Sequence, residues 1–381
     1  LQKYSALHAV CGRVCPQEKQ CESKCIHLKT GGQAVAIGYL ERFAADNADH
    51  SKLNIAKAPS NGKKVAVVGS GPAGLSFAGD MIKKGFDVTV FEALHEIGGV
   101  LKYGIPEYRL PNKIVETEIH SLEQLGVKFR KDCIVGKTIT IEELKSEEFQ
   151  GVFVASGAGL PNFMNIPGEN LINVLSSNEY LTRVNLMDAS NANTDTPVPF
   201  GKKVAVIGGG NTAMDSVRTA LRLGAERAMI IYRRSEAEMP ARVEEVKHAK
   251  EEGVEFLNLH NPIEYHGDEN GRVKEIVLQK MELGEPDASG RRSPIAIPGA
   301  TETIDVDLVI VAVGVSPNPI VPRSIKGLDL GRKNTIVVND EMESSIPMIF
   351  AGGDIVRGGA TVILAMGDGK KAAESMANKL K

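Results

Sequence analysis

Short runs of apolar, often β-branched residues recur along this 381-residue chain, separated by stretches with helical spacing of apolar positions. Residues 65–68 and 204–207 are such runs, and glycines and then an apolar-periodic segment follow each of them. This order predicts a buried parallel strand, a tight turn and a helix. Further runs at 151–159, 306–315 and 346–355 lead into glycines, as strands do beneath a bound cofactor. The pattern predicts an α/β fold.

The strongest internal signal is a repeat. The sequence GKKVAVVGSGPAGLSFAGD at residues 62–80 returns as GKKVAVIGGGNTAMDSVRT at residues 201–219. The repeat predicts two Rossmann-like dinucleotide-binding domains. Ahead of them, residues 26–58 have helical spacing, as in AVAIGYLERFAAD, and then become polar in KAPSNG, which is typical of a linker. A small helical module is therefore expected before the two domains.

The first glycine loop fits G-x-G-x-x-G directly after a strand. Such glycines permit a tight turn and a close approach of backbone to a pyrophosphate, which lies at the helix N-terminus. Glu92 ends the next strand, where a carboxylate can accept hydrogen bonds from ribose hydroxyls. The alternative is a glycine-rich turn with a solvated glutamate. The predicted contacts are Gly69, Gly71, Pro72, Ala73, Gly74 and Glu92.

The second loop has the G-x-G-x-x-A variant, and its next strand ends in two arginines instead of an acid. Guanidinium groups pair with a 2′-phosphate, which a carboxylate would repel, so this site favours NADP(H) over NAD(H). The alternative is two solvated arginines at a strand end. The predicted contacts are Gly208, Gly210, Asn211, Thr212, Ala213, Arg233 and Arg234, with Arg242 as a weaker third arginine.

Two redox-type nucleotide sites imply a relay, in which the acidic site holds a tightly bound FAD and the basic site a mobile nicotinamide. The nicotinamide must stack on the flavin within about 3 to 3.5 Å for hydride transfer. The strand ends at Gly157, Ala312 and Gly314 are the expected walls of that space. No general acid or base is expected in the hydride step, so no catalytic side chain is predicted.

Composition limits the classes of partner. The chain has 42% apolar and 24% charged residues, enough for a large core in two or three domains. Its formal net charge is −3 without a basic block, which predicts neither nucleic-acid nor membrane binding. There is no apolar run of membrane-spanning length and no signal-peptide layout, so a cytoplasmic location is expected. The chain begins at Leu1, which suggests that a longer protein has been trimmed.

Four of the five cysteines lie within residues 11–25, spaced C-x3-C-x5-C-x3-C. Thiolates at short spacing can hold iron–sulfur clusters. Zinc is the rival, although its sites usually show cysteine pairs separated by a longer insert, and a disulfide knot is disfavoured inside cells. Cys133 is the only cysteine elsewhere and is interpreted as a small apolar strand residue. Without a cysteine pair beside the flavin, dithiol chemistry is disfavoured.

The ordered set CGRVCP, GSGPAGL, FEALHEIGGVLKYGIPEYRLP, GGGNTAMD, YRRSEAEMPAR and FAGGD resembles one known group across essentially the whole chain. The group comprises the NADPH-oxidising flavoprotein subunit of glutamate synthase, the large subunit of ferredoxin:NADP transhydrogenases and the flavin half of dihydropyrimidine dehydrogenase. The resemblance implies a partial iron–sulfur domain at residues 1–58, an FAD domain at 59–163 and 312–381, and an inserted NADP domain at 164–311.

The resemblance also implies site residues. Gly98, Gly99 and Arg109 match positions that approach FAD. Asp354, after Gly353, could bind the ribityl hydroxyls or merely cap a helix, and Thr361 and Val362 open a helix facing the flavin ring. Cys15, Cys21 and Glu41 would serve one [4Fe-4S] cluster and Cys25 the other, with Cys11 a non-ligand. The family's other ligands lie upstream, so the ligand set in this chain is incomplete.

The expected function is oxidation of NADPH by an FAD enzyme that passes single electrons through clusters to a partner subunit. That partner resembles the large subunit of glutamate synthase or is linked to ferredoxin. The alternatives are a cluster-less docking subunit whose nucleotide sites are structural, and a subunit of a ferredoxin:NADP or sulfide oxidoreductase. A disulfide reductase acting alone is opposed by the missing dithiol.

Overall fold

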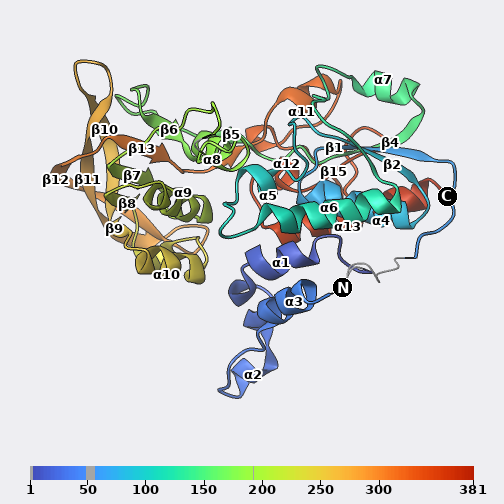
Figure 1. Cartoon of the computed structure of the whole chain (residues 1–381), viewed down its shortest axis with the longest axis horizontal. Helices are drawn as coiled ribbons and strands as arrows, with labels where there is room; N and C mark the ends of the chain where they lie inside the picture. Colours follow the sequence, from blue (N-terminus) through green and yellow to red (C-terminus); the bar gives the residue numbers. More distant parts are fainter. Residues whose placement is uncertain (1–2, 49–55, 192) are drawn as a thin grey trace. The chain divides into compact units, whose positions relative to one another are not determined.

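Two parallel five-stranded sheets organise the chain, one around each copy of the repeat (Figure 1). The structure is a computed structural model that describes residues 3–48, 56–191 and 193–381. Contacts divide the chain into two units. The first comprises Leu1–Lys102, Glu107–Leu160 and Val315–Lys381, and the second Tyr103–Pro106 and Pro161–Gly314. The helical module groups with the first unit, and its separate status as a domain stays a prediction.

The sheet of the first unit has the order β15-β4-β1-β2-β3. Its central strand is β1, whose residues from Val65 to Val68 are buried because strands lie on both sides and helices cover the sheet. Phe77 of α4 stacks on Phe153 of β4 with ring centroids 4.4 Å apart, which fixes the helix on the sheet. The strands are β1 Lys64–Val68, β2 Asp87–Phe91, β3 Lys128–Arg130, β4 Phe149–Val154 and β15 Ile349–Ala351. The helices are α4 Pro72–Lys83, α5 Val100–Tyr103, α6 Asn112–Leu125, α7 Ile141–Ser146, α11 Ile320–Ser324, α12 Asp354–Arg357 and α13 Val362–Lys379.

The N-terminal module consists of short helices, and the first of them packs against α6 and α13 of the first unit (Figure 1). Glu118 of α6 is buried, and its Oε1 atom accepts a hydrogen bond of 2.6 Å from the backbone N–H of Ala9. A carboxyl group of α6 therefore caps the first helix of the module. The elements are α1 His8–Val14, α2 Ile26–Lys29 and α3 Ile37–Asp46, with 3-10 turns at Gln17–Lys19 and Glu22–Lys24. The predicted helix at 34–46 begins only at Ile37, and residues 49–55 of the predicted helical stretch lie outside the described part.

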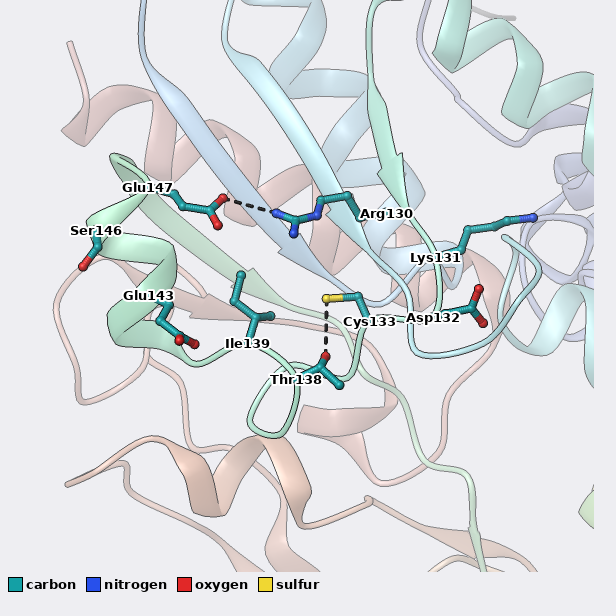
Figure 2. A pocket seen from close by; sticks show the side chains of 9 residues that line it. All are labelled: Arg130, Lys131, Asp132, Cys133, Thr138, Ile139, Glu143, Ser146 and Glu147. Carbon is teal, nitrogen blue, oxygen red and sulfur yellow. Dashed lines mark hydrogen bonds and ion pairs between the residues drawn. The ribbon is translucent and has the colours of Figure 1, made fainter.

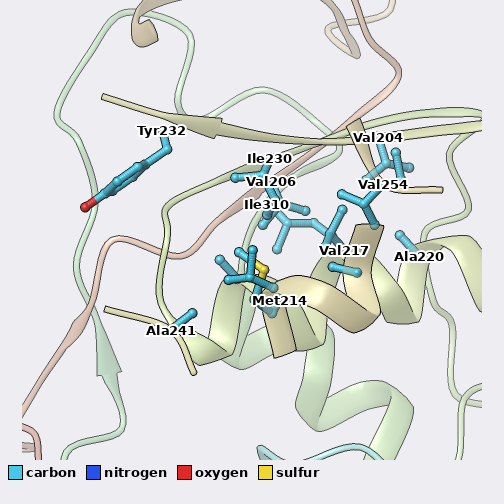
Figure 3. Close-up of a cluster of buried hydrophobic side chains, with 14 of the residues drawn as sticks. Val204, Val206, Met214, Val217, Ala220, Ile230, Tyr232, Ala241, Val254 and Ile310 are labelled. Atoms are coloured by element: carbon cyan, nitrogen blue, oxygen red, sulfur yellow. The ribbon is translucent and has the colours of Figure 1, made fainter. Parts of the chain in front are cut away.

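The sheet of the second unit has the order β6-β13-β7-β8-β9. Figure 3 shows Val206, Ile230 and Ile310 of three adjacent strands facing Met214 and Val217 of α9. This apolar layer holds the helix that starts at the second glycine loop. The strands are β6 Val174–Ser176, β7 Lys203–Ile207, β8 Arg227–Tyr232, β9 Glu255–Asn258 and β13 Leu308–Val311, and the helices are α8 Ser177–Asn185, α9 Asn211–Arg222 and α10 Val243–Glu251.

A second sheet in this unit is antiparallel and was not predicted. Its strands are β10 His260–Gly267, β11 Val273–Pro286 and β12 Arg292–Asp305, and β11 pairs with both neighbours. Its strands expose many side chains on both faces, so their sequence lacks the continuous apolar run that marks a buried strand. Two-residue strands at β5 Leu160–Pro161 and β14 Val315–Ser316 complete the topology.

Candidate functional site: two nucleotide loops and a cysteine module

The first glycine loop has the geometry that its spacing predicts. Gly69 follows β1 with φ +99°, a conformation that favours glycine, and a Cβ there would lie 2.5 Å from the carbonyl oxygen of Ala155. A Cβ on Gly74 would collide with the carbonyl oxygen of Gly69. These two glycines are needed for the turn and for close packing of α4, the helix that begins at Pro72 and continues through Ala73.

Gly71 has a different surrounding. It is the N-cap residue of α4, and a Cβ built on it meets no atom within 4 Å. Gly99 packs on this loop, because its own Cβ would lie 3.0 Å from the Cα of Gly71. Open space above the N-terminus of a twelve-residue helix suits a pyrophosphate, which gains hydrogen bonds from backbone N–H groups there. The loop therefore fits the phosphates of FAD.

Glu92 follows β2 and is buried, at 6% exposure. Its Oε2 atom accepts hydrogen bonds from the backbone N–H of Ser70, at 2.9 Å, and from the Ser70 hydroxyl, while Oε1 accepts one of 2.9 Å from Leu94. The Ser70 hydroxyl in turn accepts a bond of 2.9 Å from the N–H of Gly98. Glu92 thus organises the loop, a role that sequence reasoning missed, and its remaining lone pairs can still accept from a ribose.

A second glycine turn lies after β15. Gly353 has φ +78°, and its N–H donates a hydrogen bond of 3.0 Å to Oδ2 of Asp368. Arg357 binds the same carboxylate through two nitrogens, at 2.6 and 2.7 Å, and this pair was not predicted. Asp354 starts α12, and burial raises the pKa of its carboxyl. The turn thus presents a half-buried carboxylate, as a ribityl-binding group requires.

Helix α13 begins where the sequence predicts, with Thr361 as its N-cap residue and Val362 as its first residue. The Thr361 hydroxyl accepts a hydrogen bond of 3.1 Å from the side chain of Gln20, which lies between two of the predicted cluster ligands. The module and the N-terminus of this helix are therefore in direct contact. Of the other predicted flavin contacts, Gly98 has φ +130°, Gly99 φ +55° and Gly157 φ +69°, and Arg109 is half-buried before α6.

The second glycine loop repeats the geometry of the first. Gly208 has φ +140°, and a Cβ there would collide with the carbonyl oxygen of Ala312. In the first loop, a Cβ on Gly69 would collide with the carbonyl oxygen of Ala155 in the same way. Gly210 is the N-cap residue of α9, and the nearest atom to its Cβ is Cγ of Pro240, at 4.0 Å. The equivalence supports a second nucleotide at α9, where Asn211, Thr212 and Ala213 form the first turn.

The structure separates the two predicted arginines after β8. Arg233 is exposed, whereas the Arg234 side chain is only 7% exposed. Arg234 donates from Nε to the carbonyl oxygen of Arg292, at 2.8 Å, and from Nη2 to Oδ2 of Asp287, at 2.6 Å. Arg242 is buried, with its backbone N–H bound to Oδ1 of Asn211 at 2.9 Å and its Nη2 atom 2.9 Å from Glu244.

The strand ends after β13 are partly open. Ala312 is half-buried and Gly314 is exposed with φ +105°. The carbonyl oxygen of Gly314 accepts a hydrogen bond of 3.0 Å from the N–H of Asn162. This short exposed segment of backbone can lie against a planar ring, as the predicted wall requires.

The cysteine module has the donor types for an iron–sulfur cluster. Cys15 is buried, Cys21 is exposed and Cys25 is half-buried, accepting a bond of 3.4 Å from the N–H of Val35. Partial desolvation raises the pKa of the Cys21 thiol, and burial raises the pKa of the half-buried Glu41 carboxyl. Within the described residues, no three or more His, Cys, Asp or Glu side chains gather as a metal-binding group. The donors are thus suitable in type, but the described structure does not form a closed cage.

Cys11, the predicted non-ligand, is buried, and its Sγ atom lies 3.4 Å from Sδ of Met366 on α13. A hydrogen bond to Cys15, together with burial, raises the pKa of the Cys11 thiol. A neutral thiol packed against a thioether behaves as a small apolar group. Cys11 thus contributes to the packing of the module against α13.

A pocket of about 550 Å³ follows β3, and Figure 2 shows the side chains that line it. Arg130 and Glu147 form an ion pair of 3.2 Å across it, and Cys133 accepts a hydrogen bond of 3.6 Å from the Thr138 hydroxyl. Cys133 is half-buried in the segment that follows β3, so its interpretation as a strand residue is wrong, because β3 ends at Arg130. No second cysteine lines this pocket, which gives it no dithiol.

Comparisons with known proteins agree with this geometry. The family model described as pyridine nucleotide-disulphide oxidoreductase matches residues 63–369, and that described as dihydropyrimidine dehydrogenase domain II, 4Fe-4S cluster, matches residues 1–53. The glutamate synthase [NADPH] small chain of Halomonas elongata is 37% identical over 99% of this chain and 80% of its own length. The NADP(+)-dependent formate dehydrogenase subunit beta of Moorella thermoacetica is 37% identical over 99% of this chain and 55% of its own length.

Among solved structures, FprA from Mycobacterium tuberculosis in complex with NADPH matches with a TM-score of 0.70 and 21% identity over 85% of each chain. This likeness confirms the predicted α/β fold. No helix within the described ranges has the length and apolar character to span a bilayer. The chain belongs to the pyridine nucleotide-disulphide oxidoreductase family and, within it, to the group that contains the glutamate synthase small chains.

Proposed function

We propose that the chain oxidises NADPH with FAD as its resident cofactor and delivers the electrons through the iron–sulfur module to a partner subunit. The observation that carries the proposal is the contrast between two loops of equal geometry. The first is followed by the buried carboxylate of Glu92 and the second by the exposed guanidinium of Arg233. A carboxylate suits ribose hydroxyls, and a cation suits a 2′-phosphate.

The first unit supplies the FAD site. The N-terminus of α4 at Gly71 would bind the pyrophosphate, Glu92 the adenosine ribose and Asp354 the ribityl chain. The N-terminus of α13 at Thr361 would direct its N–H groups toward the electron-rich edge of the flavin ring. When bound, FAD accepts two electrons together and can release them singly.

The second unit supplies the NADPH site. The N-terminus of α9 at Gly210 would bind the pyrophosphate, and Arg233 the 2′-phosphate. The backbone at Ala312 and Gly314 would support the nicotinamide ring. Since the nicotinamide itself carries the hydride, these residues orient the ring and exclude water, and no side chain has to transfer a proton.

The module supplies the electron exit. Cys15, Cys21 and Glu41 would serve one cluster and Cys25 the other, with further ligands from elsewhere, because a [4Fe-4S] cluster is generally held by four thiolates. Contacts of Gln20 with Thr361 and of Cys11 with Met366 join the module to α13 near the start of that helix. This adjacency supports transfer from the flavin toward the module.

The partner is proposed to be an electron-accepting subunit of the glutamate synthase large-subunit type. A ferredoxin-linked acceptor is the alternative, and the likeness to an NADP(+)-dependent formate dehydrogenase subunit supports partners other than a glutamate synthase large subunit. A disulfide reductase acting alone is disfavoured because Cys133 has no second cysteine in its pocket. The cytoplasmic location stays a prediction.

The test is anaerobic mixing of the purified flavin-loaded chain with NADPH or NADH, followed by flavin absorbance. We expect rapid loss of oxidised-flavin absorbance with NADPH and a slower loss with NADH. The docking-subunit alternative predicts bound flavin that neither nucleotide reduces. A chain that folds but retains no flavin would contradict the proposal.

A further inference from the structure

The turn that joins β11 to β12 is attached to the end of β8 by Arg234. Two of the three guanidinium nitrogens of this arginine are engaged, Nε by the carbonyl oxygen of Arg292 and Nη2 by Asp287. The Arg234 side chain is buried, at 7% exposure, whereas the Asp287 side chain is 30% exposed at the surface. An arginine held at two points is a rigid spacer and is poorly placed to rotate toward a ligand.

The two carboxylate oxygens of Asp287 accept hydrogen bonds from different groups. Oδ1 accepts from the N–H and hydroxyl of Ser289 and shapes the turn, while Oδ2 binds Arg234. The backbone closes the turn, with the N–H of Asp287 bound to the carbonyl oxygen of Arg291 at 2.7 Å. The hydrogen bonds from Ser289 hold the pKa of Asp287 below its usual range, so the carboxylate is charged at neutral pH.

The backbone fixes the same region a second time. The carbonyl oxygen of Arg234 accepts a bond of 3.1 Å from the N–H of Leu259, whose own carbonyl oxygen accepts one of 2.8 Å from Met281 on β11. The turn is therefore attached to the carboxyl end of β8 both through its own residues, at Asp287, and through strand β11, at Met281. Arg233 precedes Arg234 in the sequence. Arg291 precedes Arg292, whose carbonyl oxygen accepts the hydrogen bond from Arg234.

Two further arginines, Arg233 and Arg291, are sequence neighbours of residues that this clamp joins. Arg233 is exposed, and Arg291 is half-buried with its Nε atom bound to the Ser289 hydroxyl at 2.9 Å. We infer that Arg233 and Arg291 bind the 2′-phosphate of an adenine nucleotide together, and that the Arg234–Asp287 pair is a positioning clamp that holds them at one site. The inference rests on the proposed NADPH oxidation and names a part of the specificity site.

The clamp and simple electrostatics predict opposite changes in nucleotide affinity when Asp287 is neutralised. Removing a carboxylate near a phosphate should tighten binding, since like charges repel. If Asp287 is a clamp, Asp287→Asn should instead weaken binding of 2′,5′-ADP by about 5- to 20-fold, the scale of a lost charge-assisted contact. Binding of ADP, which lacks the 2′-phosphate, should change less than about twofold, because the loss is confined to phosphate contacts.

The chain offers a matched control in the turn between β10 and β11. Asp268 and Asp287 both begin a D-x-x-G-R turn, and in each the aspartate N–H donates to the arginine carbonyl oxygen, at 2.8 and 2.7 Å. Asp268 likewise accepts backbone N–H bonds through Oδ1, but it is exposed, and within the described residues no arginine side chain clamps it as Arg234 clamps Asp287. Asp268→Asn should leave both affinities unchanged.

The experiment is calorimetric titration of 2′,5′-ADP and ADP into the purified full chain and its variants, with thermal melts to verify folding. Arg234→Lys should lose as much 2′,5′-ADP affinity as Asp287→Asn, and the double variant no more than either, because all three break one clamp. Arg291→Ala should weaken 2′,5′-ADP selectively. Unchanged or tighter binding by Asp287→Asn would overturn the clamp. A wild type that binds the two ligands equally would instead contradict the proposed NADPH preference itself.

Discussion

Gly71 and Gly74 belong to one loop, but there is room for a side chain only at Gly71. A Cβ on Gly74 meets fixed backbone, whereas one on Gly71 meets nothing within 4 Å. We expect Gly74→Ala to lower the free energy of unfolding by about 1 to 3 kcal/mol through overpacking. Gly71→Ala should change it by less than about 1 kcal/mol, the scale of an N-cap exchange, but should abolish flavin retention. Thermal melting of the flavin-free protein measures the stability, and the flavin content after gel filtration measures the retention. If both variants lost the same stability and the same amount of flavin, this account would be contradicted.

Glu92 organises the first loop and is also the proposed ligand of a ribose, so one substitution should affect two properties. Glu92→Ala leaves the buried N–H of Ser70 without its acceptor and would remove the proposed ribose ligand. We expect both the stability of the flavin-free protein and the affinity for FAD to fall by about 1 to 3 kcal/mol, the range for a lost charge-assisted hydrogen bond. Denaturant unfolding without flavin and fluorescence titration with FAD separate the two. Loss of affinity with full stability would mean that Glu92 does not organise the loop.

Arg233 is exposed at the end of β8 and is the proposed direct contact of the 2′-phosphate. Arg233→Ala should slow flavin reduction at limiting NADPH by about 10- to 150-fold, which corresponds to about 1.5 to 3 kcal/mol for one charged pair. Reduction by NADH should change little. Equal losses with both nucleotides would show that Arg233 supports the fold or the shared pyrophosphate.

Helix α1 depends on a residue from another element. Glu118 of α6 caps it, and burial raises the pKa of this carboxyl to about 8. His8 lies 3.4 Å away through Nδ1, and the charges of Arg13 and Glu41 also act on Glu118. Since an unfolded glutamate titrates near pH 4.5, the folded protein retains a proton between about pH 5 and 8 that the unfolded chain releases. The stability linked to Glu118 is therefore present at low pH and is lost as the pH rises toward 8.

Glu118→Gln keeps an acceptor for the N–H of Ala9 but cannot titrate. Relative to this variant, the wild type should lose about 2 to 4 kcal/mol of unfolding free energy between pH 5 and 8, since a tenfold change in proton affinity is about 1.4 kcal/mol. Urea unfolding at both pH values measures the difference, and the spectral change on iron–sulfur reconstitution reports whether the module stays docked. Parallel pH profiles for the two proteins would refute the assignment.

The elements that position the nucleotides were accessible from sequence because each combines a buried apolar strand with a glycine loop. Strands β1 and β7, the start of α13 at Thr361 and the order of the repeat were all predicted correctly. The sheet of β10 to β12 was missed, since its two-sided exposure gives no strong period. The partner of Arg234 was missed with it. Consecutive residues of an extended segment point to opposite sides, and this rule could have separated the two arginines.

At the scale of the whole molecule, each unit has its own core and its own nucleotide loop. A ligand that binds only the folded form stabilises by about 2.7 kcal/mol at one hundred times its dissociation constant. FAD should therefore raise the melting temperature of the first unit, and 2′,5′-ADP that of the second. Calorimetric scans with each ligand alone should show two separately movable transitions. A single transition that both ligands shift equally would mean that the units unfold together.

The different exposure of Glu92 and Arg233 has a kinetic consequence. Glu92, beside the first loop, is 6% exposed, whereas Arg233, after β8, is exposed. A nucleotide that hydrogen-bonds to a buried carboxylate can dissociate only when the surrounding groups move, while one held by an exposed guanidinium group can dissociate directly into solvent. We therefore expect a long lifetime for the nucleotide bound in the first unit and rapid exchange of the one bound in the second, so that the two copies of the motif differ in dissociation rate as well as in the charge that they recognise.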